Sequence, residues 1–466
     1  MPALYVRESI ALQIRYKSPL IEAFRRGVDA MMRLPTWDRR NWWFQAYMYG
    51  VAARQIPPEM QTAAAAHFNK SAQRNFFFLA WNRMHLYFLE RILRAASGDS
   101  RFVLPYWAFE DEAQSRVPAV FLPDPAELAP GADPYARRNA LARALRHPQI
   151  DRGLAGLRSD LPARCAAVLQ LASFATRDKD DPGQAFGGIV TQNPAEGGGI
   201  GGLEAIHNDV HDTLGLFGGD LGSVLTAARD PLFWVIHANL DRLWSKWIDP
   251  ARGRDLPTLD PYWMNTAFTF VDEEGREVRM SGAHIVDAQY LLRYRYEDEP
   301  PRPAPLAFAQ TVPRRMPSRT AKLVARLGAM QLGARDNRMA FAAVVPLTMA
   351  EVQSNTFRLV LRDVSARDRT SPYDVLLGAG VALPVTVGTL ALYAGGRAER
   401  SASAGPVTAS FDATGAVRQL ARAVGASLAG LGVIVLRRGL ADASGQELVS
   451  ADPDPPTIGA IELAMG

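Results

Sequence analysis

Cysteine and long apolar runs are nearly absent from this chain, and both shortages limit what it can be. Among its 466 residues there is one cysteine, Cys165, so no disulfide can form within the chain. No stretch of about 18 apolar residues is present, so we expect no membrane span. The first 30 residues lack the charged start, apolar run and cleavage site of an export signal. We therefore expect a cytoplasmic protein that makes no membrane contact.

The chain also lacks an excess of either charge. Its 52 lysines and arginines are interspersed with 48 aspartates and glutamates, for a net charge of +4. Because no basic stripe with interleaved aromatic residues is present, we do not expect a nucleic-acid partner. Hydrophobic residues make up 48% of the chain and charged residues 21%, which is typical of a globular protein with a sizeable core.

The residues that are present fall into two regions separated by prolines. Residues 1–296 hold all seven histidines and several runs with helical spacing. Residues 297–335 are rich in proline and arginine and predict a linker, because proline fixes φ and removes a backbone donor. Residues 336–466 contain short alternating runs broken by Gly, Pro, Asp and Ser, which predict an antiparallel β-sandwich. We expect a mainly α protein, with the helical domain first and the β domain second.

Three runs in the first region predict helices. Residues 81–93 are mostly apolar and contain no glycine or proline, which favours a buried helix. Residues 203–214 also have helical spacing. The run 231–248 follows Asp230, which can cap a helix, and begins with Pro231, which suits the first helical position.

Three histidines lie on the second and third of these helices. His207 and His211 are four residues apart, so both imidazoles lie on one helix face and can bind one ion. His237 lies on the next helix and can reach the same point if the two helices pack together. Imidazole suits copper, zinc, nickel and iron, so the spacing alone does not choose the metal. The alternative is that these are ordinary histidines of amphipathic helices.

The residues around these histidines resemble the second copper motif of tyrosinases, catechol oxidases and plant polyphenol oxidases. The matching segments are HNDVHDTLG at 207–215 and DPLFWVIHANLDRLW at 230–244. The resemblance implies a four-helix-bundle copper domain at 1–296, with His207, His211 and His237 as ligands of one copper ion. It also implies that Phe233 packs near the metal. The family has a second histidine just before the third ligand, and here that position is Ile236.

The resemblance assigns roles to three further residues of the same segment. Asn208 matches the family asparagine that helps to hold an active-site water. Glu204 lies near the glutamate that shares this task, one residue away from its usual spacing. Asp212 follows the second ligand, at a position that lines the pocket in relatives, and we expect it to select substrate charge.

The sequence resembles the first copper motif of the family in the residues around the ligands, but the ligand histidines themselves are absent. The run QRNFFFLAWNRMHLYFLER at 73–91 aligns without a gap. The three ligand positions carry Tyr49, Gln73 and Asn82, none of which is a good copper ligand. This pattern indicates that a metal site was replaced within an intact fold.

The family reduces dioxygen with one electron from each of two copper ions. A single copper supplies one electron, so we do not expect ordinary dicopper tyrosinase activity. We predict a mononuclear copper oxidoreductase that acts on an aromatic or phenolic small molecule with dioxygen. Three histidines and a water also suit zinc, which stays an alternative metal.

Two other functions stay open. One is a non-catalytic homologue, either a binding module or the partner of an active paralogue in an oligomer. The other is a two-metal oxidase whose first site is relocated to His85 and His67, although we favour a packing role for His85. The β domain resembles the C-terminal domain of latent plant polyphenol oxidases, which can cover the copper entrance, and its alternative role is to stabilise the first domain.

Overall fold

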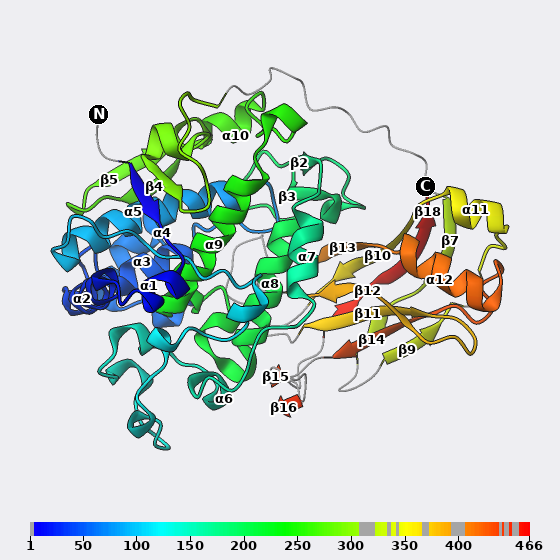
Figure 1. Cartoon of the computed structure of the whole chain (residues 1–466), viewed down its shortest axis with the longest axis horizontal. Coiled ribbons are helices and arrows are strands. Elements are labelled where there is room, and N and C mark those ends of the chain that lie inside the picture. The colour runs from blue at the N-terminus through cyan, green and yellow to red at the C-terminus, as the bar shows by residue number, and fades with distance from the viewer. Residues whose placement is uncertain are drawn as a thin grey trace.

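The computed structural model describes residues 4–306, 322–332, 337–341, 344–365, 372–392, 406–437, 440–441, 447–449 and 456–466. Helices fill the first domain and antiparallel strands fill the second, which lies to the right in Figure 1. The long helices of the first domain are α2 (Pro19–Arg33), α5 (Phe78–Ser97), α8 (Gly202–Leu214) and α9 (Pro231–Trp247). None of the described helices is both long enough and apolar enough to cross a membrane.

The three predicted helices are confirmed, and local signals explain where they begin and end. Residues 81–93 lie within α5, which ends at Gly98 in the left-handed region at φ 70°. Residues 203–214 lie within α8. The side chain of Asp230 accepts a hydrogen bond from the backbone N–H of Leu232 and caps α9, with Pro231 in the first turn.

A buried ion-pair network joins α5 to α9. The Asp241 carboxylate accepts hydrogen bonds from Arg83 Nε at 2.5 Å and from the Tyr294 and Tyr296 hydroxyls, both at 2.6 Å. Burial alone would raise the pKa of Asp241, but the nearby arginine charges and the two hydroxyls lower it overall. The two tyrosines lie on β6 (Tyr294–Tyr296), which pairs with β1 (Tyr5–Arg7) and closes the first domain.

The second domain is built from two four-stranded sheets. In the first sheet, β10 (Phe357–Val364) lies between β13 (Val407–Asp412) and β18 (Ala460–Met465), with β7 (Lys322–Leu327) next to β18. In the second, β11 (Tyr373–Gly378) lies between β12 (Val385–Leu390) and β14 (Gly432–Arg437), with β9 (Asn337–Ala340) next to β14. Side chains from both sheets form one buried core, which agrees with the predicted sandwich.

The structure differs from the sequence prediction at the start of the second domain. Strand β7 lies inside the range assigned to the linker, so the predicted boundary at residue 336 is too late. Residues 307–321 of that range lie outside the described residues. Two helices of this domain were not predicted, α11 (Met349–Ser354) and α12 (Thr414–Val424). They carry no chemical motif and serve to cover the core, into which α12 buries Val417 and Leu420.

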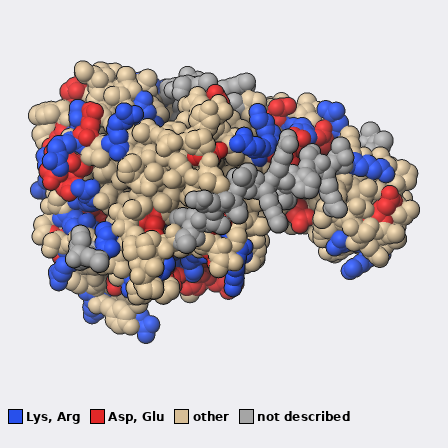
Figure 2. Space-filling view, turned by 90° about the horizontal axis from the view of Figure 1, so that it is seen from above, with Lys and Arg blue, Asp and Glu red and all other residues tan. Residues whose placement is uncertain are grey.

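The two domains are joined by ion pairs. Arg158 Nη2 lies 2.6 Å from Asp374 Oδ1. Arg358 Nε lies 2.8 Å from Asp181 Oδ2, and Asp181 also accepts a hydrogen bond from the Ser410 hydroxyl at 2.7 Å. On the face shown in Figure 2, positive and negative side chains are interspersed and do not form one basic stripe.

Candidate metal centre

Three histidine side chains converge between α8 and α9. His207 Nε2 lies 3.1 Å from His237 Nε2, and His211 Nε2 lies 3.4 Å from the same atom. All three residues are buried. Within the described part of the chain, they are the one group of three or more histidine, cysteine or acidic residues whose ligand atoms lie this close together. The packing of α8 on α9 thus brings together the ligands that the sequence predicted.

The other ring nitrogens of the two α8 histidines are held by hydrogen bonds. His211 Nδ1 lies 2.9 Å from the carbonyl oxygen of Leu221, which can only accept, so Nδ1 carries the proton. His207 Nδ1 lies 2.9 Å from Asn208 Oδ1 and donates in the same way. In both rings Nε2 is therefore left with its lone pair facing the shared point, which is the arrangement a metal ligand needs.

The electrostatic environment also suits a metal ion. Burial lowers the pKa of His211 to about 3. Burial and the neighbouring histidines lower the pKa values of His207 and His237 well below the usual range. Neutral imidazoles are the form that binds metals, so this donor set fits copper, and it fits zinc equally well.

The packing residues predicted around the third ligand lie as follows. The Phe233 ring stacks on His237, with centroids 3.9 Å apart and 29° between the planes. This stacking orients the His237 ring, whose Nδ1 has no hydrogen-bond partner among the described residues. Ile236 is fully buried in the core and offers no donor atom.

Tyr49, Gln73 and Asn82 stand at the positions that the sequence resemblance matched to the ligands of the first copper motif. Their side chains form hydrogen bonds within the protein. Gln73 Nε2 donates to the Tyr49 hydroxyl at 3.0 Å, and Asn82 Nδ2 donates to the carbonyl oxygen of Phe78 at 2.8 Å. Tyr49 ends α3 (Trp42–Tyr49), and its ring lies edge-on to His237 with centroids 5.6 Å apart. A hydrogen-bonded Tyr49–Gln73 pair therefore lies beside the three histidines.

The structure does not bring His85 and His67 into a second metal site. His85 lies between Trp81 and Trp234, at centroid distances of 4.6 and 4.8 Å, and burial lowers its pKa to about 3. His67 Nε2 instead lies 3.0 Å from Glu277 Oε1. In the described ranges neither histidine belongs to a group of three potential ligands. This placement agrees with a packing role for His85.

The residues predicted to position water or substrate have different partners. Glu204 Oε1 accepts a hydrogen bond from the backbone N–H of Arg74 at 2.7 Å, and burial raises its pKa to about 8. Asp212 Oδ2 accepts one from the backbone N–H of Leu392 at 2.9 Å. Asn208 Nδ2 donates to the Ala391 carbonyl oxygen at 3.4 Å. Two of the three predicted residues therefore contact the second domain.

Residues 391 and 392 follow β12, and their backbone groups bond to Asn208 and Asp212 of α8, next to His207 and His211 in the sequence. Figure 1 shows β12 on the side of the second domain that faces α8. Sequence reasoning did not single them out, because no local pattern marks a contact with a residue about 180 positions away. The one sequence feature that could have pointed to this contact is the alternating run of β12, which ends directly before these two residues. The structure thus places the second domain over Asn208 and Asp212.

Two family models match the chain. The common central domain of tyrosinase matches residues 39–249, and the polyphenol oxidase middle domain matches residues 258–304. The first range contains the three histidines and the positions of Tyr49, Gln73 and Asn82.

This chain is similar to known tyrosinases and polyphenol oxidases over part of their length. The chain is 29% identical to a tyrosinase from Hahella sp. (strain CCB-MM4) over 318 residues, which is 64% of this chain and 65% of that protein. It is 29% identical to a chloroplastic polyphenol oxidase of Vitis vinifera over 290 residues, which is 59% of this chain and 45% of that protein. Each match spans less than two thirds of the relative.

Solved structures share the fold over nearly the whole chain. A recombinant latent aurone synthase, a polyphenol oxidase, aligns with a TM-score of 0.60 at 20% identity, over 100% of this chain and 90% of that chain. A tyrosinase from Burkholderia thailandensis aligns with a TM-score of 0.56 at 15% identity, over 94% and 95% of the two chains. At these identities the likeness establishes the fold alone.

Proposed function

The chain belongs to the tyrosinase and polyphenol oxidase family, and we propose that it is a copper oxidoreductase with a single metal ion. Its proposed substrates are an aromatic or phenolic small molecule and dioxygen. The family acts on phenols with oxygen, and the three-histidine site is the part of that machinery which this chain keeps.

One contrast carries the proposal of a single metal ion. The ligand set on α8 and α9 is complete, with three buried Nε2 atoms facing one point. At the other set, Tyr49 and Gln73 bond to each other and Asn82 bonds to the backbone. The amide nitrogens of Gln73 and Asn82 are thus directed at protein acceptors, and no histidine occupies any of the three positions, which supports a protein-filled first site.

Residues around the three histidines have separate roles in this proposal. When bound, a copper ion would supply one-electron redox chemistry at this site. Asn208 orients His207, and the raised pKa of Glu204 keeps its carboxyl protonated near neutral pH. Because Asn208 and Asp212 bond to residues 391 and 392, we propose that substrate reaches the histidines when this segment moves away.

Metal content and spin state test the proposal directly. The full chain is loaded with copper, washed, and measured by elemental analysis and electron spin resonance. We expect one copper ion per chain with an ordinary Cu(II) signal. His207→Ala should bind none, whereas the control His284→Ala, which changes an exposed histidine, should keep one.

Other results would favour other functions. Two copper ions with a silent spectrum would mean that a coupled pair survives and would contradict the proposal. No bound metal would favour a non-catalytic homologue. Stoichiometric zinc in protein purified without added metal, with no copper exchange, would favour hydrolytic chemistry.

A further inference from the structure

A small pocket lined by aromatic residues opens on the first domain and shares no residue with the histidine site. Its volume is about 220 Å³. Its walls include Trp43 and Tyr47 of α3, Tyr135, and Arg229 just before α9. These residues come from segments far apart in the sequence, so the pocket is a product of the tertiary fold.

The aromatic walls are held in place by contacts with one another and with residues behind them. The Trp43 and Tyr135 rings meet edge to face, with centroids 5.4 Å apart. The Tyr135 hydroxyl donates to the Asp220 carboxylate at 2.7 Å, and the Tyr47 ring meets Phe68 edge to face at 5.5 Å. Rings fixed in this way before binding offer a preorganised surface for a planar aromatic group.

Arg229 supplies a positive charge to the pocket and forms no ion pair with a carboxylate in the described part of the chain, although its charge partly offsets the burial that raises the pKa of Asp220. Its Nη2 donates to the uncharged amide oxygen of Gln55 at 2.7 Å, and its guanidinium carbon lies 5.5 Å from the centre of the Tyr47 ring. Its Nε is buried and makes no hydrogen bond within the described chain. The Gln55 amide and the Tyr47 ring are both uncharged, which leaves the guanidinium charge available to an anion from outside.

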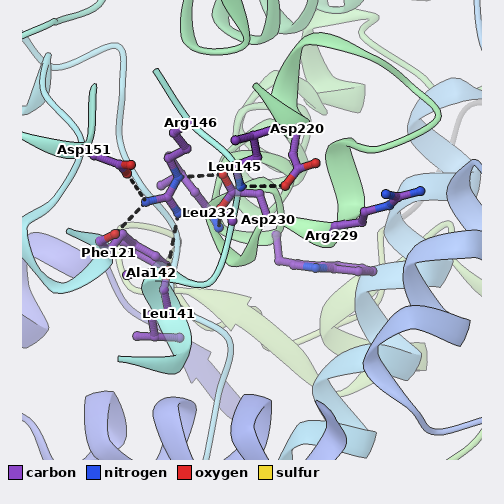
Figure 3. A network of polar contacts seen from close by, with 12 residues as sticks. Phe121, Leu141, Ala142, Leu145, Arg146, Asp151, Asp220, Arg229, Asp230 and Leu232 are labelled. Carbon is purple, nitrogen blue, oxygen red and sulfur yellow. Dashed lines mark hydrogen bonds and ion pairs between the residues drawn. The ribbon is translucent and has the colours of Figure 1, made fainter. Parts of the chain in front are cut away.

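The acidic residues near Arg229 in the sequence form hydrogen bonds with other residues. Asp230 accepts bonds from Arg146 Nε and Nη2, at 2.7 and 2.6 Å, and caps α9. Asp220 accepts bonds from Tyr135 and from the backbone N–H of Leu145. Figure 3 shows the Arg229 side chain extending away from both carboxylates. At the rim, Glu59 accepts a hydrogen bond from the Thr36 hydroxyl.

We propose that this pocket is a second binding site, for a small aromatic carboxylate. Aromatic walls select a planar ring, and a guanidinium matches a carboxylate with two parallel hydrogen bonds. The volume lies below the roughly 300 Å³ at which drug-sized pockets begin, so the ligand has one ring. Because the lining includes none of the three histidines, binding does not require a metal ion.

Binding of 4-hydroxybenzoate to metal-free full-length protein tests this site. Calorimetry should give one saturable site per chain. Phenol lacks the carboxylate and cyclohexanecarboxylate lacks the aromatic ring, so each should bind at least about tenfold more weakly. Arg229→Gln should weaken 4-hydroxybenzoate binding about 10- to 100-fold, because a charged hydrogen-bond partner is lost.

Two control variants make the result decisive. Arg101→Gln removes the same charge from an exposed position of this domain and should leave binding unchanged. His211→Ala removes a metal ligand and should also leave it unchanged. Binding that survives in Arg229→Gln and is lost in His211→Ala would locate the ligand at the histidines and overturn the proposal. Equal losses in Arg229→Gln and Arg101→Gln, or no saturable binding, would overturn it as well.

Discussion

Gln73 donates a hydrogen bond to the hydroxyl of Tyr49 at 3.0 Å, and both residues occupy positions that carry metal ligands in the family. The Tyr49 ring also lies edge-on to Phe233 with centroids 4.7 Å apart, and Phe233 stacks on His237. The Tyr49–Gln73 pair is therefore connected to the three-histidine cluster by direct packing. Through Phe233, this pair belongs to the core that positions His237.

The Tyr49–Gln73 pair should contribute stability without binding metal. Tyr49→Phe and Gln73→Leu should each cost about 1–3 kcal/mol in the free energy of unfolding, because each leaves a buried polar partner without its bond. The double variant should cost less than the sum of the two. Urea unfolding of the four proteins measures this coupling. Copper content should stay at one ion in all of them, and a drop from two ions to one would reveal a metal bound at these positions.

The loop that holds His211 should not tolerate a side chain at Gly215. A Cβ there would meet the backbone of Gly222, next to Leu221, whose carbonyl oxygen holds His211 Nδ1. Gly215→Ala should therefore lower both thermal stability and copper affinity. Gly415→Ala is the matched control, because a Cβ at that helical position meets no atom within 4 Å and should stabilise by about 0.5–1 kcal/mol. Unchanged copper affinity in Gly215→Ala would show that the Leu221 contact is dispensable.

Glu204 should make stability fall as pH rises. Its pKa is about 8 in the folded protein, against an ordinary value of 4.5, because of burial. The folded state therefore binds more protons than the unfolded state between these two values, and stability is lost as pH rises through this range. Glu204→Gln keeps an acceptor for the Arg74 N–H and should be more stable than the wild type near pH 8.5 but not near pH 4.5. Urea unfolding at both pH values measures the difference.

The exposed Glu112→Gln serves as the control for this experiment and should show no difference between the two pH values. An equal effect of Glu204→Gln at both pH values would mean that the carboxyl does not titrate with folding.

The ion pair between Arg158 and Asp374 should hold the second domain on the first. Arg158→Gln leaves the buried Asp374 carboxylate without this hydrogen-bonded partner, at a cost of about 1–3 kcal/mol. Because residues 391 and 392 lie beside the histidines, a chelator should also remove copper faster from this variant. Chelation kinetics and limited proteolysis measure the effect. Arg252→Gln changes an ion pair whose arginine is exposed and whose partner, Asp249, is only partly buried, and it should alter neither rate.

The sequence by itself determined the features that depend on local spacing. Two histidines four residues apart must lie on one face of α8, and Asp230 followed by Pro231 must begin a helix. Alternating apolar residues likewise predicted β10 and β13 of the sandwich. Strand β7 was missed because its short alternating run follows a proline-rich segment and its pairing partner, β18, lies more than 130 residues away.

Only the tertiary structure decided which of these elements meet. His237 reaches the two α8 histidines because α9 packs on α8, and His85 and His67 fail to meet because Trp81, Trp234 and Glu277 surround them. The contact of Asp212 with Leu392 and the aromatic pocket around Arg229 join segments that no local pattern connects. The physical reason is that side-chain spacing along one element is set by backbone geometry, whereas contacts between elements are set by the packing of the whole core.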